Sequence, residues 1–143
     1  MTNKPARIVV GVDGSSSSLQ ALKWAVDHAV LTGATVQAVI AWQVPNLYGY
    51  PVTDGEDWGK DAQQAINIAL DTVLGKDSAK VSSTVIQGYP AKVLLDAAAG
   101  ADLLVVGNRG HSEFTEMLLG SVSQHVVTHA TCPVLVMRHV PAA

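Results

Sequence analysis

Apolar residues along the chain follow two patterns: short runs that are continuous or alternating, and longer stretches with helical spacing. The short runs predict strands over residues 7–12, 35–41, 80–87, 102–106 and 133–138. The longer stretches predict helices over residues 16–32, 55–74, 90–99 and 122–129. Glycines after residues 32 and 74 and a proline at residue 90 match the helix boundaries. Strands and helices therefore alternate, which predicts an α/β fold with a parallel sheet.

The composition of each strand predicts its place in the sheet. The first and fourth strands are apolar on both faces, as central parallel strands are, whereas residues 80–87 contain Ser and Thr and suit an edge. A single open, doubly wound parallel sheet in the order 3-2-1-4-5, with helices on both faces, satisfies this pattern. Its winding reverses between strands one and four, and open α/β sheets bind ligands at the carboxyl ends of strands at such a reversal. We therefore expect a site beside Asp13 and Gly107.

The fifth predicted strand, residues 133–138, is strongly apolar although this order leaves it at an edge. An exposed apolar edge invites pairing with another chain unless something covers it. We expect a two-fold homodimer in which the two fifth strands face each other. The alternative is that the C-terminal residues 139–143 fold over the edge.

Composition narrows the range of partners. The 143 residues include 9 Lys and Arg against 12 Asp and Glu, a formal net charge of −3, and the basic residues are scattered. Nucleic acid and anionic membranes are therefore not expected partners. No apolar run approaches the ~20 residues of a membrane-spanning helix, no signal-peptide pattern is present, and Cys132 has no partner for an internal disulfide. We expect one soluble, cytoplasmic domain over residues 1–143.

The segment over residues 106–123 contains the most informative chemistry. Gly107 comes directly after a predicted strand, Gly110 follows three residues later, and Gly120 comes just before a predicted helix. Glycines let backbone approach phosphate closely, and the N–H groups and dipole of a helix start hold anionic oxygens. Three further residues offer a positive charge or hydroxyl donors: Arg109, Ser121 and Ser123. The segment predicts a phosphate site; the alternative is a tight turn followed by a serine-capped helix.

The glycine spacing, Gly107-x-x-Gly110 followed after nine residues by Gly120-Ser121, resembles the nucleotide-binding signature of the universal stress protein family. Two further motifs carry the resemblance, GVDGS at residues 11–15 and HATCPVLVMR at residues 129–138. The resemblance implies the 3-2-1-4-5 sheet, dimerisation through the fifth strand, and membership of the branch that binds ATP. The implied function is an ATP-binding regulatory protein of the stress response, with slow or no hydrolysis.

The same resemblance implies which residues contact the nucleotide. Asp13 is expected to contact the ribose or a phosphate-bound Mg²⁺. The backbone ending strand two is expected to meet the adenine: Val39, Ile40 and Ala41. Ribose and phosphates are expected to contact Gly107, Arg109 and Gly110, and the phosphates to be held by Gly120, Ser121, Val122 and Ser123. The residues leave a second role open for Asp13, because Asp-Gly in VDGS also suits a turn.

Other candidate chemistry is less well supported by the sequence. His125 and His129 have the spacing of zinc ligands, but no third ligand is evident. Cys132 precedes a proline at a strand start, where a small buried residue is expected. The aromatic residues of the 42–58 loop either cover the nucleotide as a flap or pack against the second helix; both interpretations stay open.

Other function classes differ in the motifs that they require. An adenylating enzyme or weak ATPase similar to the ATP-α-hydrolases is the alternative function, but that class carries SGGxDS where this chain has GVDGSSSS. A receiver-type phosphoacceptor requires an aspartate where the third strand ends in Gln87-Gly88, and the Walker signature is absent. No catalytic residue is predicted, so any ATPase activity is expected to be slow.

Overall fold

The computed structural model describes residues 5–44, 46–47, 50–51, 57–75, 81–109 and 119–138. The strands in these ranges are β1 (Arg7–Gly11), β2 (Thr35–Trp42), β3 (Asn46–Leu47), β4 (Tyr50–Pro51), β5 (Val81–Gln87), β6 (Leu103–Gly107) and β7 (Val134–Met137). The helices are α1 (Ser16–Thr32), α2 (Trp58–Leu74), α3 (Pro90–Ala97) and α4 (Ser121–His129). No helix in these ranges combines the length and apolarity needed to cross a bilayer.

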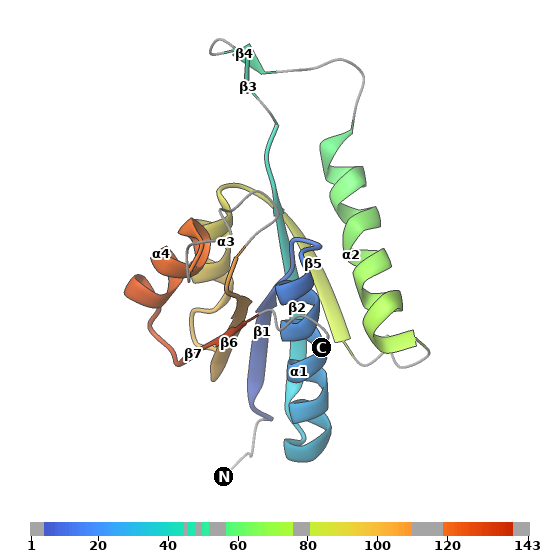
Figure 1. The fold of residues 1–143 in the computed structure, drawn as a ribbon, viewed down its shortest axis with the longest axis vertical. Helices are drawn as coiled ribbons and strands as arrows, with labels where there is room; N and C mark the ends of the chain where they lie inside the picture. Colours follow the sequence, from blue (N-terminus) through green and yellow to red (C-terminus); the bar gives the residue numbers. More distant parts are fainter. Residues whose placement is uncertain are drawn as a thin grey trace.

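The main sheet has the strand order β5-β2-β1-β6-β7. Each neighbouring pair is parallel, and Ile8 of the central strand β1 lies between Val36 of β2 and Leu103 of β6. When only these five strands are numbered, the order is 3-2-1-4-5, so the predicted topology is confirmed. Helices α1 and α2 cover one face and α3 and α4 cover the other (Figure 1). The winding reverses between β1 and β6, and this reversal positions the site.

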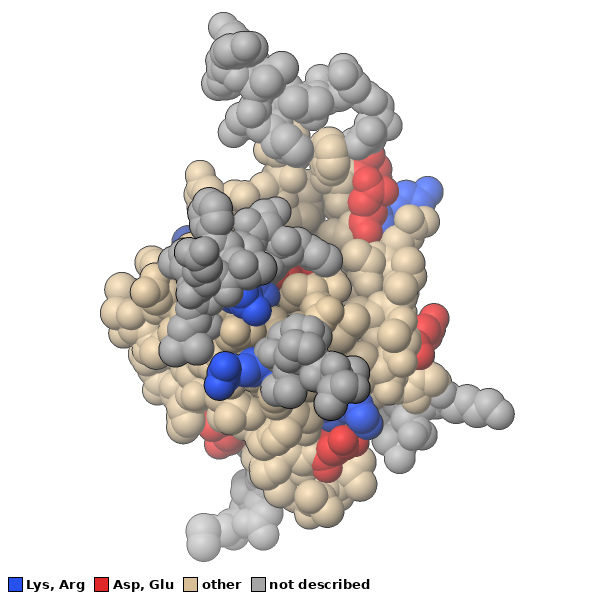
Figure 2. Space-filling view, viewed as in Figure 1, with Lys and Arg blue, Asp and Glu red and all other residues tan. Residues whose placement is uncertain are grey.

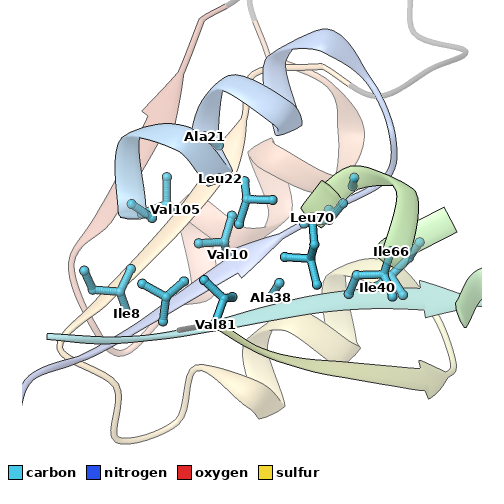
Figure 3. Close-up of a cluster of buried hydrophobic side chains, with 14 of the residues drawn as sticks. Ile8, Val10, Ala21, Leu22, Ala38, Ile40, Ile66, Leu70, Val81 and Val105 are labelled. Atoms are coloured by element: carbon cyan, nitrogen blue, oxygen red, sulfur yellow. The ribbon is translucent and has the colours of Figure 1, made fainter. Parts of the chain in front are cut away.

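The core has two parts, one on each face of the sheet. Successive residues of a strand point to opposite faces, so Val10 packs under α1 and α2 whereas Val9 packs under α3 and α4. Figure 3 shows the first part, where Leu22 of α1 and Ile66 of α2 meet the sheet. All four side chains are fully buried. The central strands are therefore apolar on both faces, as the sequence pattern predicts.

Predicted and observed boundaries differ by no more than three residues. The largest difference is the start of α2, which begins at Trp58 because Asp57 caps it and accepts a hydrogen bond from the Lys60 N–H at 3.0 Å. Helix α1 is capped in the same way, since the Ser15 hydroxyl accepts the Ser18 N–H. It ends at Gly33, whose φ of 78° suits glycine. Local capping chemistry therefore sets where α1 and α2 begin.

The segment after β2 departs from the predicted plain loop. Strands β3 and β4 form a two-stranded antiparallel sheet that lies beyond the end of β2 (Figure 1). Trp42 packs against α2, because a Cβ placed on Gly59 would lie 3.0 Å from Cζ2 of its indole. Trp42 therefore fits the packing interpretation. The side chains of Tyr48 and Tyr50 lie outside the described residues, so their role as a flap stays a prediction.

Candidate functional site

A pocket opens at the switch point, where the carboxyl ends of β1 and β6 lie side by side. Its cavity volume is about 110 Å³. Its lining comes from three neighbouring strands, the starts of three helices and the loops between them: Gly11, Val12, Asp13, Ser15, Ser18, Val39, Ala41, Pro90, Leu94, Val106, Gly107, Arg109, Gly120, Val122 and Ser123. The fold therefore places a concave site where the sheet topology predicts one.

Most of the residues predicted from the sequence meet at this pocket: Asp13, Val39, Ala41, Gly107, Arg109, Gly120, Val122 and Ser123. Ile40 does not line it, because its side chain packs in the core cluster beneath α2 (Figure 3). Ser121 is exposed at the start of α4 and is also not part of the lining. Gly110, His111 and Ser112 lie outside the described residues.

Sequence reasoning missed several lining residues: Gly11, Val12, Ser15, Ser18, Pro90, Leu94 and Val106. A signal for three of them was present, since Ser15 caps α1, Pro90 begins α3 and Val106 precedes the first glycine. Helix starts meet at the carboxyl edge of a parallel sheet, so their capping residues could have been included. Leu94 had no such signal, because only tertiary packing brings the second turn of α3 to the pocket.

The loop after β1 is held by its own side chains. Oδ1 of Asp13 accepts hydrogen bonds from the Ser15 N–H, at 2.9 Å, and from the Ser15 hydroxyl. The Asp13 N–H donates to Oγ of Ser18, which in turn donates to the Ser15 carbonyl. Gly14 adopts a φ of 82°, a left-handed conformation that favours glycine. Asp13 is therefore a turn residue, while its exposed carboxylate also lines the pocket.

The loop after β6 is held by distant donors. Three consecutive carbonyl oxygens, those of Gly107, Asn108 and Arg109, each accept a hydrogen bond. The donors are, in order, the Ser123 hydroxyl, the Gly120 N–H and the Ser17 hydroxyl. Because these bonds engage the carbonyls, the peptide groups at the end of β6 are fixed by α4 and α1.

Ser123 differs from its expected role. Its side chain was expected to offer a hydroxyl donor to phosphate, but the hydroxyl donates to the Gly107 carbonyl instead. The residue is buried, with 4% of its surface exposed. In this structure, Ser123 joins the start of α4 to the end of β6, and its hydroxyl proton is already engaged.

Gly107 is required by packing against α1. A Cβ at this position would lie 2.3 Å from Oγ of Ser17 and 2.8 Å from backbone atoms of Ser17 and Ser18. Real Cβ atoms do not approach backbone this closely, so a side chain would separate β6 from α1. The glycine therefore serves the helix contact beside any role it has at a ligand.

Three helices begin at the pocket. Ser15 caps α1, Pro90 is the first residue of α3, and Gly120 caps α4 without a side chain that could accept hydrogen bonds. The first N–H groups of a helix lack intrahelical acceptors, and the helix dipole places partial positive charge there. The three helix starts together favour an anionic group in the pocket.

Formal charge at the site is sparse. In the described lining, Asp13 and Arg109 are the charged residues, and their charges cancel. Figure 2 shows blue and red side chains scattered over the face in view, with the two signs mixed. The electrostatic preference of the pocket therefore comes mainly from the helix starts and from the placement of Arg109.

One wall of the pocket is apolar. Val39 and Ala41 from the end of β2 line it together with Pro90 and Leu94 of α3. Gly11 leaves room for this wall, since a Cβ there would lie 2.8 Å from Cδ1 of Leu94. An apolar surface next to helix starts suits a ligand with a flat apolar part and an anionic part.

Among the described residues, the histidines (His28, His125 and His129) and Cys132 are not part of the pocket lining. His125 and His129 stack on the exposed side of α4, with ring centroids 4.4 Å apart. Over the described residues, no group of three or more His, Cys, Asp or Glu side chains could hold a metal ion. Cys132 is partly buried against the α3 and α4 side of the core.

The chain belongs to the universal stress protein family, whose model matches residues 5–138. It is 34% identical over 134 residues to a universal stress protein of Thermus aquaticus, and the match covers 92% of this chain and 97% of that protein. It is 32% identical over 137 residues to universal stress protein Rv2623 of Mycobacterium tuberculosis, covering 93% of this chain. The chain spans 45% of that relative, about half of its length.

Solved structures share the fold. UspA from Lactobacillus plantarum has a TM-score of 0.76 at 23% identity, covering 96% of this chain and 100% of that chain. A universal stress protein in complex with cAMP has a TM-score of 0.68 at 29% identity, covering 92% of this chain and 95% of that chain. The second of these proteins therefore holds an adenine nucleotide.

Proposed function

We propose that this chain is an ATP-binding regulatory protein of the stress response and that the switch-point pocket holds the nucleotide. The observation that carries the proposal is the junction of three helix starts with an apolar wall in one pocket. The family membership and the cAMP complex of a relative at 29% identity support the choice of an adenine nucleotide. A regulator of this kind must be in contact with cellular ATP, so we propose the cytoplasm as its location.

The chemistry of the lining suggests how the nucleotide divides between its walls. The apolar wall of Val39, Ala41 and Leu94 suits the base. The start of α4 and the Arg109 guanidinium suit the phosphates, because both offer positive charge or N–H donors.

Mg²⁺ is the cation that we propose to accompany ATP, with Asp13 as its protein ligand. Mg²⁺ usually binds through one or two carboxylates together with substrate phosphates. Asp13 fits this donor set, because Oδ1 is engaged by Ser15 while the carboxylate is exposed at the pocket. A single carboxylate is sufficient only when phosphate oxygens complete the coordination, so binding of metal and nucleotide is expected to be coupled.

Hydrolysis is proposed to be slow or absent. Phosphoryl transfer requires a positioned base or water-orienting group next to compensated charge. Among the described lining residues, Asp13 is the candidate base, and it is engaged in its own turn. The binding event itself, rather than turnover, is therefore proposed to carry the signal.

A homodimer through β7 is the proposed assembly. The Pro133 and Met137 carbonyls accept hydrogen bonds from β6 and Asn108, so the alternate residues Val134 and Val136 turn their backbone groups to the other side. Among the described strands, β7 pairs with β6 alone. We propose that a second copy of the chain pairs with this edge.

Sedimentation of Val136→Pro tests the dimer, because proline removes an edge-facing N–H without taking one from the β6 ladder. The wild-type chain is expected to sediment as a dimer and the variant as a monomer, with a cooperative unfolding transition in both. A wild-type monomer, or a variant that remains dimeric, would contradict the assembly.

Mass spectrometry of small molecules released by denaturing the freshly purified protein tests the function. ATP, ADP or AMP is expected at a substantial fraction of one per chain, and titration calorimetry of the emptied protein is expected to show binding of ATP. A protein that releases no nucleotide and binds none in calorimetry would refute the proposal. Turnover of Mg-ATP at the ~1–100 s⁻¹ of kinases would refute the slow-hydrolysis part alone.

A further inference from the structure

Ser17 is a buried polar residue that capping does not explain. It lies in the first turn of α1, with 3% of its surface exposed, but the cap of that helix is Ser15. The Ser17 hydroxyl donates to the Arg109 carbonyl at 2.9 Å, across 92 residues of sequence. Ser17 therefore connects the first helix to the residue that supplies the positive charge of the pocket.

The Ser17 side chain lies close against Gly107. Oγ of Ser17 lies 2.3 Å from the position that a Cβ on Gly107 would occupy, so the hydroxyl fills the space left by the absent side chain. From that space it reaches past Gly107 to the peptide group two residues further along. The absence of a side chain at Gly107 therefore makes room for the Ser17 hydroxyl and its hydrogen bond to Arg109.

We propose that Ser17 is a positioning residue for the anionic part of the ligand, acting through Arg109; this inference rests on the proposed function. The hydrogen bond fixes the Arg109 peptide and engages its carbonyl lone pair. Without the hydroxyl, that carbonyl loses this hydrogen bond, and a peptide group that turns its oxygen toward the pocket would repel a phosphate. The Arg109 side chain would lose its fixed anchor at the same time.

The test compares Ser17→Ala with Ser16→Ala, an exposed neighbour on the same turn. Calorimetry with adenosine, AMP and Mg-ATP separates the base from the phosphates. Ser17→Ala is expected to weaken AMP and Mg-ATP binding by about tenfold, the effect of losing one hydrogen bond near a charge, and to leave adenosine binding within about twofold. Ser16→Ala is expected to match the wild type for all three ligands.

The outcomes separate positioning from a structural role. Equal loss for adenosine and the nucleotides would assign Ser17 a structural role, and no loss for any ligand would overturn the inference directly. A wild-type chain that binds none of the three overturns the proposed function, and the inference with it. Ser17→Cys keeps a side chain of similar size, and its thiol is a weak hydrogen-bond donor. Its nucleotide affinity is therefore expected to lie between those of the wild type and Ser17→Ala. Wild-type affinity of Ser17→Cys would also overturn the inference.

Discussion

The loop after β1 and the loop after β6 line the same pocket, but they are held by different parts of the chain. Asp13, Ser15 and Ser18 hold the first loop through hydrogen bonds that span at most five residues. The second loop, from Gly107 to Arg109, receives its hydrogen bonds from α1 and from the start of α4. The first loop is therefore a local motif, and the second exists only in the assembled fold.

This difference has consequences for mutation. In the first loop, a substitution removes a turn contact or the cap of α1, and it leaves the contacts between β6 and the helices in place. In the second loop, the same atoms hold the site and join β6 to two helices, so a substitution there changes stability and binding together. The two loops can therefore be distinguished by measuring unfolding free energy and ligand affinity on the same variants.

Gly107→Ala is expected to have the largest effect. The added Cβ meets backbone atoms of Ser17 and Ser18 at 2.8 Å, so α1 must shift from β6. Overpacking of this kind costs about 1–3 kcal/mol in the free energy of unfolding, measured by urea denaturation. Gly33→Ala is the matched control: nothing lies within 4 Å of its Cβ position, and its cost comes from the positive φ of 78° alone.

The two glycine variants are expected to differ in binding as well as in stability. Gly107→Ala is expected to weaken nucleotide binding in protein that is still folded, whereas Gly33→Ala, at the far end of α1, leaves affinity unchanged. A Gly107→Ala protein with wild-type stability would show that β6 and α1 are less closely packed than this structure has them.

Ser123→Ala is expected to have the next largest effect. The substitution removes the Ser123 hydroxyl that donates to the half-buried Gly107 carbonyl, which costs about 1–2 kcal/mol of stability. The exposed neighbour Gln124 provides the control, since Gln124→Ala is expected to stay within about 0.5 kcal/mol. If both variants unfold at the same urea concentration, the Ser123 hydroxyl does not hold the loop in solution.

The contrast between the loops also separates what the sequence could predict from what it could not. Hydrophobic periodicity reports which faces of a strand are buried, so β1 and β6 could be placed at the centre and the switch point located between them. The VDGS turn could also be predicted, because its hydrogen-bond donors and acceptors are sequence neighbours. Both features depend on short-range information.

Long-range contacts at the site could not be predicted in this way. Nothing in the sequence pattern pairs Ser17 with Arg109 or places Leu94 of α3 on the pocket wall, because periodicity does not specify which residue faces which. The Ser123 hydroxyl was predicted to donate to phosphate, but it donates to the Gly107 carbonyl, an acceptor that only the folded chain brings next to it.

Asp13→Asn is expected to have the smallest effect on stability and the most selective effect on binding. Asparagine keeps an oxygen that can accept the Ser15 N–H, so the turn and the unfolding free energy are expected to stay within about 0.5 kcal/mol of wild type. It removes the charge that we propose binds Mg²⁺. ATP affinity is therefore expected to lose its dependence on Mg²⁺, with affinity in EDTA unchanged or higher.

The comparison with Asp13→Ala sharpens this prediction, because alanine removes both the charge and the turn acceptor. Alanine is expected to lower stability by about 1 kcal/mol in addition to removing the Mg²⁺ dependence. If Asp13→Asn retains the full Mg²⁺ dependence of ATP binding, Asp13 serves the turn alone and the cation is held elsewhere. In that case the loop after β1 would contribute shape to the pocket, and the loop after β6 would be the only one of the two that contributes charge.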